Sequence, residues 1–291
     1  MIPVRRWVSV PAGRLFAWQW GAGPDLVVLP GVEEALLSRA ALGWVMGRWW
    51  APFARRYGMR VTALAARESV PPEFTTQQMG QDAAAALEAL GVRPAAIVGV
   101  GAGGAVAEWA AVEVALRGSA PPALILLSVP AGLRTTGAQA GFYDHLVRLL
   151  RGTSPEQAFD HLCGLYLDAD LGRRHRLMVK LLRRWGRSGD VQRAVRLLGA
   201  WRAHDARPIE SRLRALPILM VSGGFDALVL QEPANGQRGA PVLRPARHVW
   251  LAGEHGAFLA YWETVTAEMA RFARERAPAY SEEAAPSPVS V

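Results

Sequence analysis

The sequence predicts an α/β fold in which a mostly parallel central sheet is covered by helices on both faces. Three observations carry this prediction. Apolar segments of strand length alternate with segments of helical periodicity along most of the chain. A hairpin precedes the alternation, which places antiparallel strands at one edge of the sheet. One long helical block interrupts the alternation, and we expect this block to be an insertion between two strands.

The N-terminal part contains the hairpin, a strand, a helix and a second strand. The hairpin joins two short apolar runs through Pro11-Ala12-Gly13, a turn-forming tripeptide. After a glycine-rich turn, DLVVLP at residues 25–30 is typical of a buried strand. Apolar residues at helical spacing, such as Leu37, Ala41 and Trp44, then predict a helix. The predicted elements are residues 4–10, 14–20, 25–30, 36–57 and 60–65.

The alternation of strands and helices continues through the rest of the chain. Thr75 or Thr76 can cap a helix that runs to Leu90. Gly91 follows this helix, at a position where a left-handed residue often ends a helix. The further predicted strands are residues 95–100, 123–128, 217–222 and 248–252, and the further helices are residues 103–117 and 257–276.

The helical block at residues 131–215 predicts a lid over the carboxyl edge of the sheet. Ser154-Pro155-Glu156 combines a cap with proline at the first helical position. A stripe of helical spacing follows, formed by Phe159, Leu162, Cys163 and Tyr166. The expected organisation is therefore a core of residues 1–130 and 216–277, an arginine-rich helical lid of residues 131–215, and a disordered tail of residues 278–291.

The net charge of +8 comes entirely from the predicted lid. Residues 131–215 hold 16 basic and 8 acidic residues, whereas the remainder holds 17 of each. A solvated arginine-rich helical face explains this surplus, and an acidic partner at the lid is the alternative. We predict no nucleic-acid partner, because no zinc-finger spacing or aromatic RNA-binding motif accompanies the charge.

The remaining composition predicts a cytoplasmic protein without a membrane span. No apolar stretch approaches the roughly 20 residues that a membrane-spanning helix needs. The N-terminal residues lack the apolar core of a signal peptide. The single cysteine, Cys163, excludes an internal disulfide and a cysteine-based metal cluster. We expect neither a metal ion nor a cofactor.

A glycine-rich turn between a predicted strand and a predicted helix is the first candidate site. It reads Gly99-Val100-Gly101-Ala102-Gly103-Gly104. The spacing fits the dinucleotide-binding pattern G-x-G-x-x-G, but that turn normally follows the first strand of its fold. Here about 95 residues precede the turn, and the next predicted strand ends at Ser128 without an acidic residue. The spacing also fits G-x-S-x-G, the turn that presents a nucleophilic serine, except that Gly101 replaces the serine.

Two downstream segments favour the second interpretation. Asp226 follows a strand in PILMVSGGFD, and His255 lies in Gly253-Glu254-His255-Gly256 before the last helix. An aspartate in a polar turn is commonly a solvated cap, and a histidine in a glycine-rich loop commonly has no special role. Here both residues occupy the places where hydrolases with such a turn carry their acid and their histidine. Over residues 4–276 the chain resembles the α/β-hydrolase superfamily with a helical lid. This resemblance implies that His255, oriented by Asp226, removes a proton from a hydroxyl at position 101, which Gly101 does not have.

The resemblance also places a ligand cleft around the glycine-rich turn. The loop after residues 27–30 normally supplies an oxyanion-binding N–H, and here it carries Glu33 and Glu34. These carboxylates either begin the next helix or point into the cleft, where they suit a cationic or hydroxylated ligand. Trp44, Trp49 and Trp50 follow on that helix. The predicted ligand-binding residues are Gly31, Val32, Glu33, Val100, Ala102 and Trp109.

Three functions stay open from the sequence. The first is a hydrolase-like protein that binds a small apolar molecule under the lid with little or no serine-type hydrolysis. The second is an enzyme that uses His255 with Asp226 as a general base without a covalent intermediate, as in lyase or cofactor-free oxygenase reactions. The third is residual ester or amide hydrolysis by an activated water. The fold alone does not choose between them.

Overall fold

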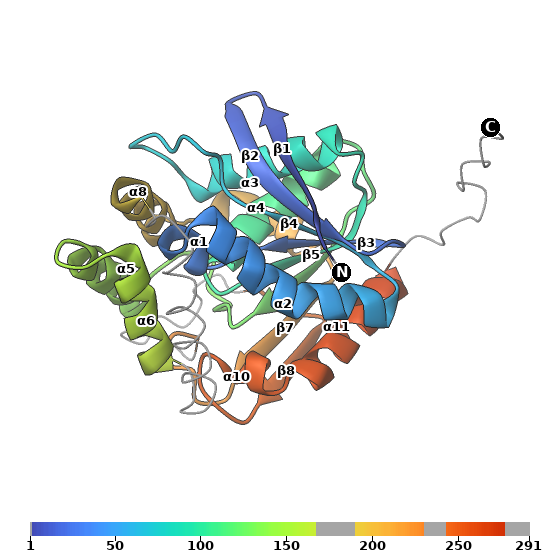
Figure 1. Cartoon of the computed structure of the whole chain (residues 1–291). Coiled ribbons are helices and arrows are strands. Elements are labelled where there is room, and N and C mark those ends of the chain that lie inside the picture. The colour runs from blue at the N-terminus through green and yellow to red at the C-terminus, as the bar shows by residue number, and fades with distance from the viewer. Residues whose placement is uncertain (1, 167–189, 230–242, 277–291) are drawn as a thin grey trace.

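The computed structural model describes residues 2–166, 190–229 and 243–276 and contains an eight-stranded sheet. The strands follow the order β1-β2-β4-β3-β5-β6-β7-β8 (Figure 1). The β1–β2 hairpin joins the sheet by antiparallel pairing, and every later pair of neighbours is parallel. The strands are β1 Val4–Val10, β2 Gly13–Trp20, β3 Asp25–Leu29, β4 Arg60–Leu64, β5 Pro94–Val100, β6 Ala123–Leu127, β7 Ile218–Gly223 and β8 Arg247–Leu251.

Helices cover both faces of the sheet, as predicted. α3 (Thr76–Ala89) and α4 (Gly103–Leu116) pack together against one face, and α2 (Arg39–Tyr57) and α11 (Trp262–Arg276) cover the other (Figure 1). The other helical elements are α1 Glu33–Leu36, α5 Gly137–Leu150, α6 Pro155–Tyr166, α8 Val191–Arg202, the 3₁₀ turn η1 Arg207–Ile209, α9 Glu210–Leu213 and α10 Ala257–Ala260.

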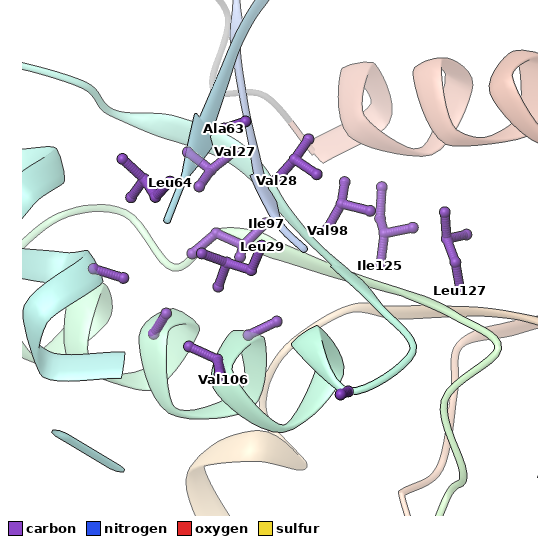
Figure 2. Close-up of a cluster of buried hydrophobic side chains, with 14 of the residues drawn as sticks. Val27, Val28, Leu29, Ala63, Leu64, Ile97, Val98, Val106, Ile125 and Leu127 are labelled. Atoms are coloured by element: carbon purple, nitrogen blue, oxygen red, sulfur yellow. The ribbon is translucent and has the colours of Figure 1, made fainter. Parts of the chain in front are cut away.

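The core lies along the central parallel strands. Every residue of β3, β6 and β7 is buried, because helices exclude water from both faces of these strands. Figure 2 shows Val27, Ile97 and Ile125 in this layer, with Val106 of α4 beneath it. Buried β-branched and leucine side chains therefore fix the strands in place, and the site is built on their ends.

Two predicted helices are each divided in the structure. Within the helix predicted at residues 36–57, Leu36 ends α1 and α2 begins at Arg39, because Ser38 adopts an extended backbone and its hydroxyl accepts the Ala41 N–H at 3.3 Å. The helix predicted at residues 257–276 separates into α10 and α11 at Tyr261. Elsewhere the predicted boundaries hold within two residues, including the Thr75 cap of α3 and the left-handed Gly91 after it.

The block at residues 131–215 is largely helical where it is described, but it is not helical throughout. Residues 131–136 and 203–206 are extended or turn segments, and Arg134 pairs with Asp205 in an isolated antiparallel bridge. Residues 167–189 of this block and the predicted tail at residues 278–291 lie outside the described residues. The role of this block as a lid over the carboxyl edge of the sheet stays a prediction.

Several arginines of this block already bond to acceptors within the chain. The acceptors are side chains and backbone carbonyls of the block itself and of the core. The arginines concerned are Arg193, Arg196, Arg202, Arg207 and Arg214. An acidic partner at the arginine-rich block stays a prediction, and these five arginines give it no support.

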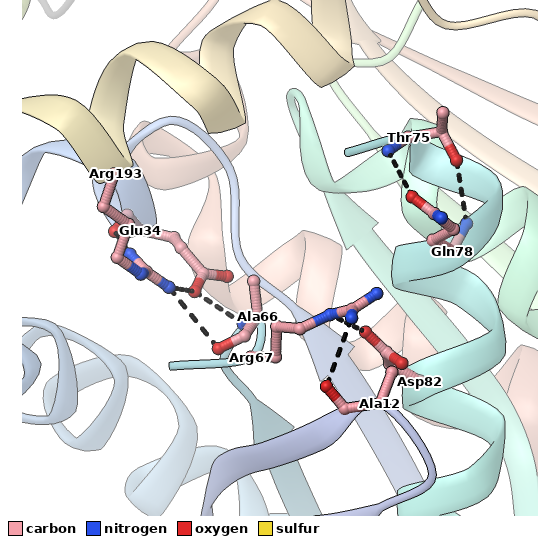
Figure 3. A network of polar contacts seen from close by, with 8 residues as sticks. All are labelled: Ala12, Glu34, Ala66, Arg67, Thr75, Gln78, Asp82 and Arg193. Atoms are coloured by element: carbon pink, nitrogen blue, oxygen red, sulfur yellow. Dashed lines mark hydrogen bonds and ion pairs between the residues drawn. The ribbon is translucent and has the colours of Figure 1, made fainter. Parts of the chain in front are cut away.

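An ion pair joins α8 to α1, the short helix that follows β3. The Glu34 carboxylate is 3% exposed and lies 2.9 Å from the Arg193 guanidinium, which also donates to the Glu34 carbonyl at 3.2 Å. The same carboxylate accepts the Ala66 N–H at 2.6 Å (Figure 3). Burial raises the pKa of the Glu34 carboxyl, and Arg193 opposes this rise. The interaction joins the inserted helices to the core beside the candidate site.

A second buried contact links the end of the insertion to α3 and α4. The His204 ring lies 2.9 Å from the Thr76 hydroxyl through Nδ1 and 3.1 Å from the Glu108 carboxyl through Nε2. All three side chains are buried, so each depends on the others for its hydrogen bonds. Loss of the imidazole leaves a buried carboxyl and a buried hydroxyl without this partner.

We therefore expect His204→Leu to lower the free energy of unfolding by about 3 kcal/mol. Urea unfolding followed by tryptophan fluorescence measures this change. His161→Leu removes an exposed histidine of α6 and is the matched control, with an expected change within about 0.5 kcal/mol. Equal effects of the two substitutions would contradict the structural role of His204.

Candidate active site

The carboxyl ends of five parallel strands meet at one edge of the sheet, and the candidate site residues follow them. Gly31 comes after β3, Gly101 after β5 and Ser128 after β6. Asp226 and His255 come after β7 and β8. In open α/β sheets this edge is where ligands bind, because the loops that leave the strands converge there.

The glycine-rich turn connects β5 directly to α4. Gly101 has a φ of +50°, and its N–H donates to the Leu127 carbonyl at 2.8 Å. A Cβ at Gly103 would lie 2.2 Å from the Leu29 carbonyl oxygen, and one at Gly104 would lie 2.4 Å from the Val129 side chain. These two glycines therefore allow α4 to begin in contact with the ends of β3 and β6.

Asp226 and His255 form a hydrogen-bonded pair. The Asp226 carboxylate is 1% exposed, and its Oδ2 lies 2.9 Å from His255 Nδ1. Its Oδ1 accepts the Leu228 N–H at 2.9 Å. The backbone thus fixes Oδ1, and Oδ2 holds the imidazole in one orientation. An orienting carboxylate acts in the same way in a catalytic triad.

The loop that carries His255 is held by the two neighbouring strand ends. The Phe225 N–H donates to the Gly253 carbonyl at 2.9 Å, and the Ser128 hydroxyl donates to the His255 carbonyl at 2.7 Å. Ser128 has a φ of +52°, which is rare for a residue with a side chain. The sequence interpretation gave Ser128 no role. The structure shows that it holds the His255 backbone.

Gly101 faces the imidazole of His255. A Cβ built at Gly101 would lie 3.7 Å from His255 Nε2, and no other described atom beyond the adjoining backbone lies within 4 Å. A hydroxyl on that Cβ would come within hydrogen-bonding reach of the ring, about 2.6–3.2 Å. The structure thus brings Gly101, Asp226 and His255 together across 154 residues of sequence, from position 101 to position 255.

Glu33 turns its carboxylate back onto the loop after β3. Its Oε1 accepts the Gly31 N–H at 2.9 Å, and the side chain contributes to the wall of the cavity at this edge. Burial raises the pKa of the Glu33 carboxyl, and the neighbouring Glu34 carboxylate adds to the rise. The Gly31 hydrogen bond and His255 act in the opposite direction. Glu33 thus begins α1, and its side chain also lines the cavity.

A cavity of about 180 Å³ lies above Gly101 and His255. Five of the six predicted ligand-binding residues line it: Gly31, Val32, Glu33, Val100 and Ala102. Its walls are mainly apolar, and they come from α2, α5, α6, α10 and α11. Seven aromatic side chains contribute to them, namely Trp49, Trp50, Phe142, Tyr143, Phe159, Phe258 and Trp262.

Trp109, the sixth predicted ligand-binding residue, is not among the described residues that line this cavity. Trp109 is buried on α4 at the contact with α3, where a Cβ at Gly80 would lie 2.4 Å from the Trp109 Cβ. Trp44 is 46% exposed and also lies outside the lining. The helix that starts at the glycine turn therefore directs its tryptophan into the contact with α3 and not into the cavity lining.

Sequence reasoning missed the contributions of the inserted helices and of the C-terminal helices. Gln139 and Tyr143 of α5 and Trp262 of α11 line the cavity, and burial raises the pKa of Tyr143. Phe159 and Cys163 of α6, interpreted from sequence as a packing stripe, line it as well. The helical spacing of Phe159 and Cys163 predicts that they share one face of α6. It does not indicate what that face contacts.

Neither a metal cluster nor a membrane-spanning helix is found in the described part of the chain. Its His, Cys, Asp and Glu side chains do not gather in any group of three or more that could hold a metal ion. Its helices are all too short or too polar to cross a membrane.

Solved structures similar to this chain share its fold. A hydrolase from Pseudomonas aeruginosa is 21% identical with a TM-score of 0.68, over 92% of this chain and 97% of that one. An enol-lactonase from Burkholderia xenovorans is 18% identical with a TM-score of 0.68, over 92% and 99%. A bromoperoxidase from Bacillus anthracis is 14% identical with a TM-score of 0.65, over 93% and 100%. No protein-family model and no curated protein matches the sequence. The chain therefore has the α/β-hydrolase fold.

The backbone of Gly101 generates a prediction about stability. Gly101→Ala should lower the free energy of unfolding by about 1 kcal/mol, because a left-handed φ is costly for a residue with a Cβ while the space is open. Gly104→Ala should cost about 3 kcal/mol, because its Cβ overlaps Val129. Gly152→Ala, where a Cβ meets nothing, is the control in urea unfolding. A more stable Gly101→Ala protein would refute this account.

The position of Glu33 generates a second prediction. Because its pKa is raised in the folded protein, ionisation of Glu33 costs stability as the pH rises from the unfolded value, about 4.3, through the folded value. Glu33→Gln keeps an acceptor for the Gly31 N–H and removes this cost. We expect the variant to gain stability over the native chain with rising pH, and to match it near pH 4. Urea unfolding between pH 4 and 8 measures the difference.

The matched control for this experiment is Glu73→Gln, which changes an exposed carboxyl outside the cavity. The prediction is contradicted if the stability advantage of the Glu33→Gln protein over the native chain shrinks as the pH rises.

Proposed function

We propose that this protein binds a small, largely apolar molecule in the cavity above Gly101 and does not carry out serine-type hydrolysis. The observation that carries the proposal is the empty position at Gly101, opposite the imidazole of His255 and beneath aromatic walls. In hydrolases of this fold the turn between strand and helix presents the nucleophile. Removal of such a nucleophile lowers turnover by about 10⁶-fold in a serine protease.

The charge beside the turn supports the same proposal. Acyl transfer develops a negative oxygen, which backbone N–H groups of the elbow and of the loop after β3 stabilise. In this loop the Gly31 N–H is already bonded to the Glu33 carboxylate. A carboxylate at that place opposes a developing oxyanion and so raises the barrier to hydrolysis.

General-base catalysis is the second candidate function, and the Asp226–His255 pair favours it. The 2.9 Å hydrogen bond orients the imidazole toward the cavity, where it can remove a proton from a bound molecule without a covalent intermediate. The fold accommodates several activities, since an enol-lactonase and a bromoperoxidase are among its similar structures. Under this second function, His255 removes a proton from the bound ligand, because Gly101 has no hydroxyl that could supply one.

Mass spectrometry under native conditions tests the first candidate, because a bound small molecule travels with the folded protein. We expect the purified chain to carry such a molecule, and Val45→Phe, which fills the cavity, to reduce its occupancy. Turnover of the released molecule by the native chain, lost in His255→Ala, would move the assignment to the second candidate.

Covalent labelling tests the assignment of position 101. The native chain should not react with a fluorophosphonate that labels activated serines. Gly101→Ser should become labelled, because its hydroxyl comes within reach of His255 Nε2. Adding His255→Ala to Gly101→Ser should slow this labelling at least about 100-fold. Circular dichroism confirms folding of each variant. Labelling of the native chain would overturn the proposal.

A further inference from the structure

The cavity holds one carboxylate among walls that offer it little positive charge. Glu33 is the acidic residue among the described residues of the lining, and no arginine or lysine of the described part of the chain belongs to that lining. The other polar side chains there are Ser128, Gln139, Tyr143 and His255. Glu34 lies next to Glu33 in sequence, but its carboxylate is directed to Arg193.

A second oxygen lies beside the Glu33 carboxylate. The point where Gly31 would carry a Cβ is 2.9 Å from Glu33 Oε2 and 2.7 Å from the Val100 carbonyl oxygen. The Ala102 nitrogen lies 3.5 Å from the same point. Two acceptors, one of them ionisable, therefore lie close together against Gly31. This arrangement favours a positive group over a negative one.

The walls add a further preference for positive charge. Trp49 and Trp50 of α2 and Trp262 of α11 pack edge to face, with ring centroids 5.2 and 5.3 Å apart for the two pairs that involve Trp262. All three line the cavity. Indole rings attract cations through their faces, and this attraction strengthens when water is excluded.

The volume of the cavity limits the ligand to a small one. An engineered cavity of about 150 Å³ in another protein takes up benzene. The 180 Å³ of this cavity therefore suits a body of about one ring with a short polar extension.

From these contacts we infer that the cavity binds a small organic cation, an amine or ammonium compound with an apolar body of about one ring, whose positive group pairs with Glu33. The inference rests on the proposed function and adds the chemical class of the ligand. The site then has the fold of a hydrolase but prefers a positively charged ligand. A hydrolase of this fold stabilises a negatively charged oxyanion at the same place.

A set of three compounds of similar size tests the charge preference. 2-Phenylethylammonium carries a positive group, 2-phenylethanol a neutral one and phenylacetate a negative one. Titration calorimetry of the native chain at pH 7 measures the dissociation constants. We expect the ammonium compound to bind about tenfold more tightly than the alcohol, and phenylacetate to bind most weakly.

Two substitutions assign this preference to Glu33. Glu33→Gln keeps the size and the acceptor for the Gly31 N–H, so it should weaken binding of the ammonium compound about tenfold while the alcohol changes less than about twofold. Glu263→Gln removes an exposed carboxyl of α11, whose side chain is 85% exposed, and should change neither affinity. Val45→Phe should weaken all compounds that bind in the cavity.

The outcomes separate the inference from the proposed function. If the alcohol binds as tightly as the ammonium compound and Val45→Phe weakens both, the cavity binds small molecules and the cation inference fails. If none of the three compounds binds, the inference and the proposed apolar cavity site both fail. If Glu33→Gln does not fold, the order of the three affinities in the native chain still decides the charge preference.

Discussion

The site depends on the close contact between the first turn of α4 and the ends of β3 and β6. Backbone oxygens of the loop after β3 and the side chain of Val129 leave no room for a Cβ at Gly103 or Gly104. This contact fixes the turn, and the turn fixes Gly101 beneath His255 and Gly31 beside Val100. The glycines are needed here for packing, whether or not chemistry takes place at the turn.

Around this fixed turn, Asp226 and His255 form an ordered pair, whereas position 101 has no side chain. The Asp226 carboxylate is still held by backbone N–H groups and still binds the imidazole. The hydroxyl that such a pair normally serves has no counterpart at Gly101. Next to it, a loop amide is bonded to the Glu33 carboxylate. The first feature leaves no nucleophile at position 101, the second opposes a developing oxyanion, and both support the proposed binding function.

The sequence predicted the sheet, its antiparallel edge and the meeting of positions 101, 226 and 255, because these features follow from local periodicity and from the order of strand ends. It assigned Trp109 to the cavity, which this residue does not line, because nearly every position of α4 is buried and no polar face marks the outside of this helix. The strained backbone of Ser128 was also hidden, since serine carries no signal for a positive φ. The contact of His204 with Thr76 and Glu108 spans 128 and 96 residues, and no local pattern indicates it.

The Arg193–Glu34 pair has a consequence for how this architecture can diversify. In many layered folds a covering segment is modular, so recombination can exchange it while the scaffold is preserved. Here the inserted block at residues 131–215 and the core share a buried ion pair. A foreign segment that lacks this guanidinium leaves the buried Glu34 carboxylate without its ion-pair partner, one residue from Glu33 in the cavity wall. Chimeras of this protein therefore require that the loop after β3 and α8 be inherited as a unit.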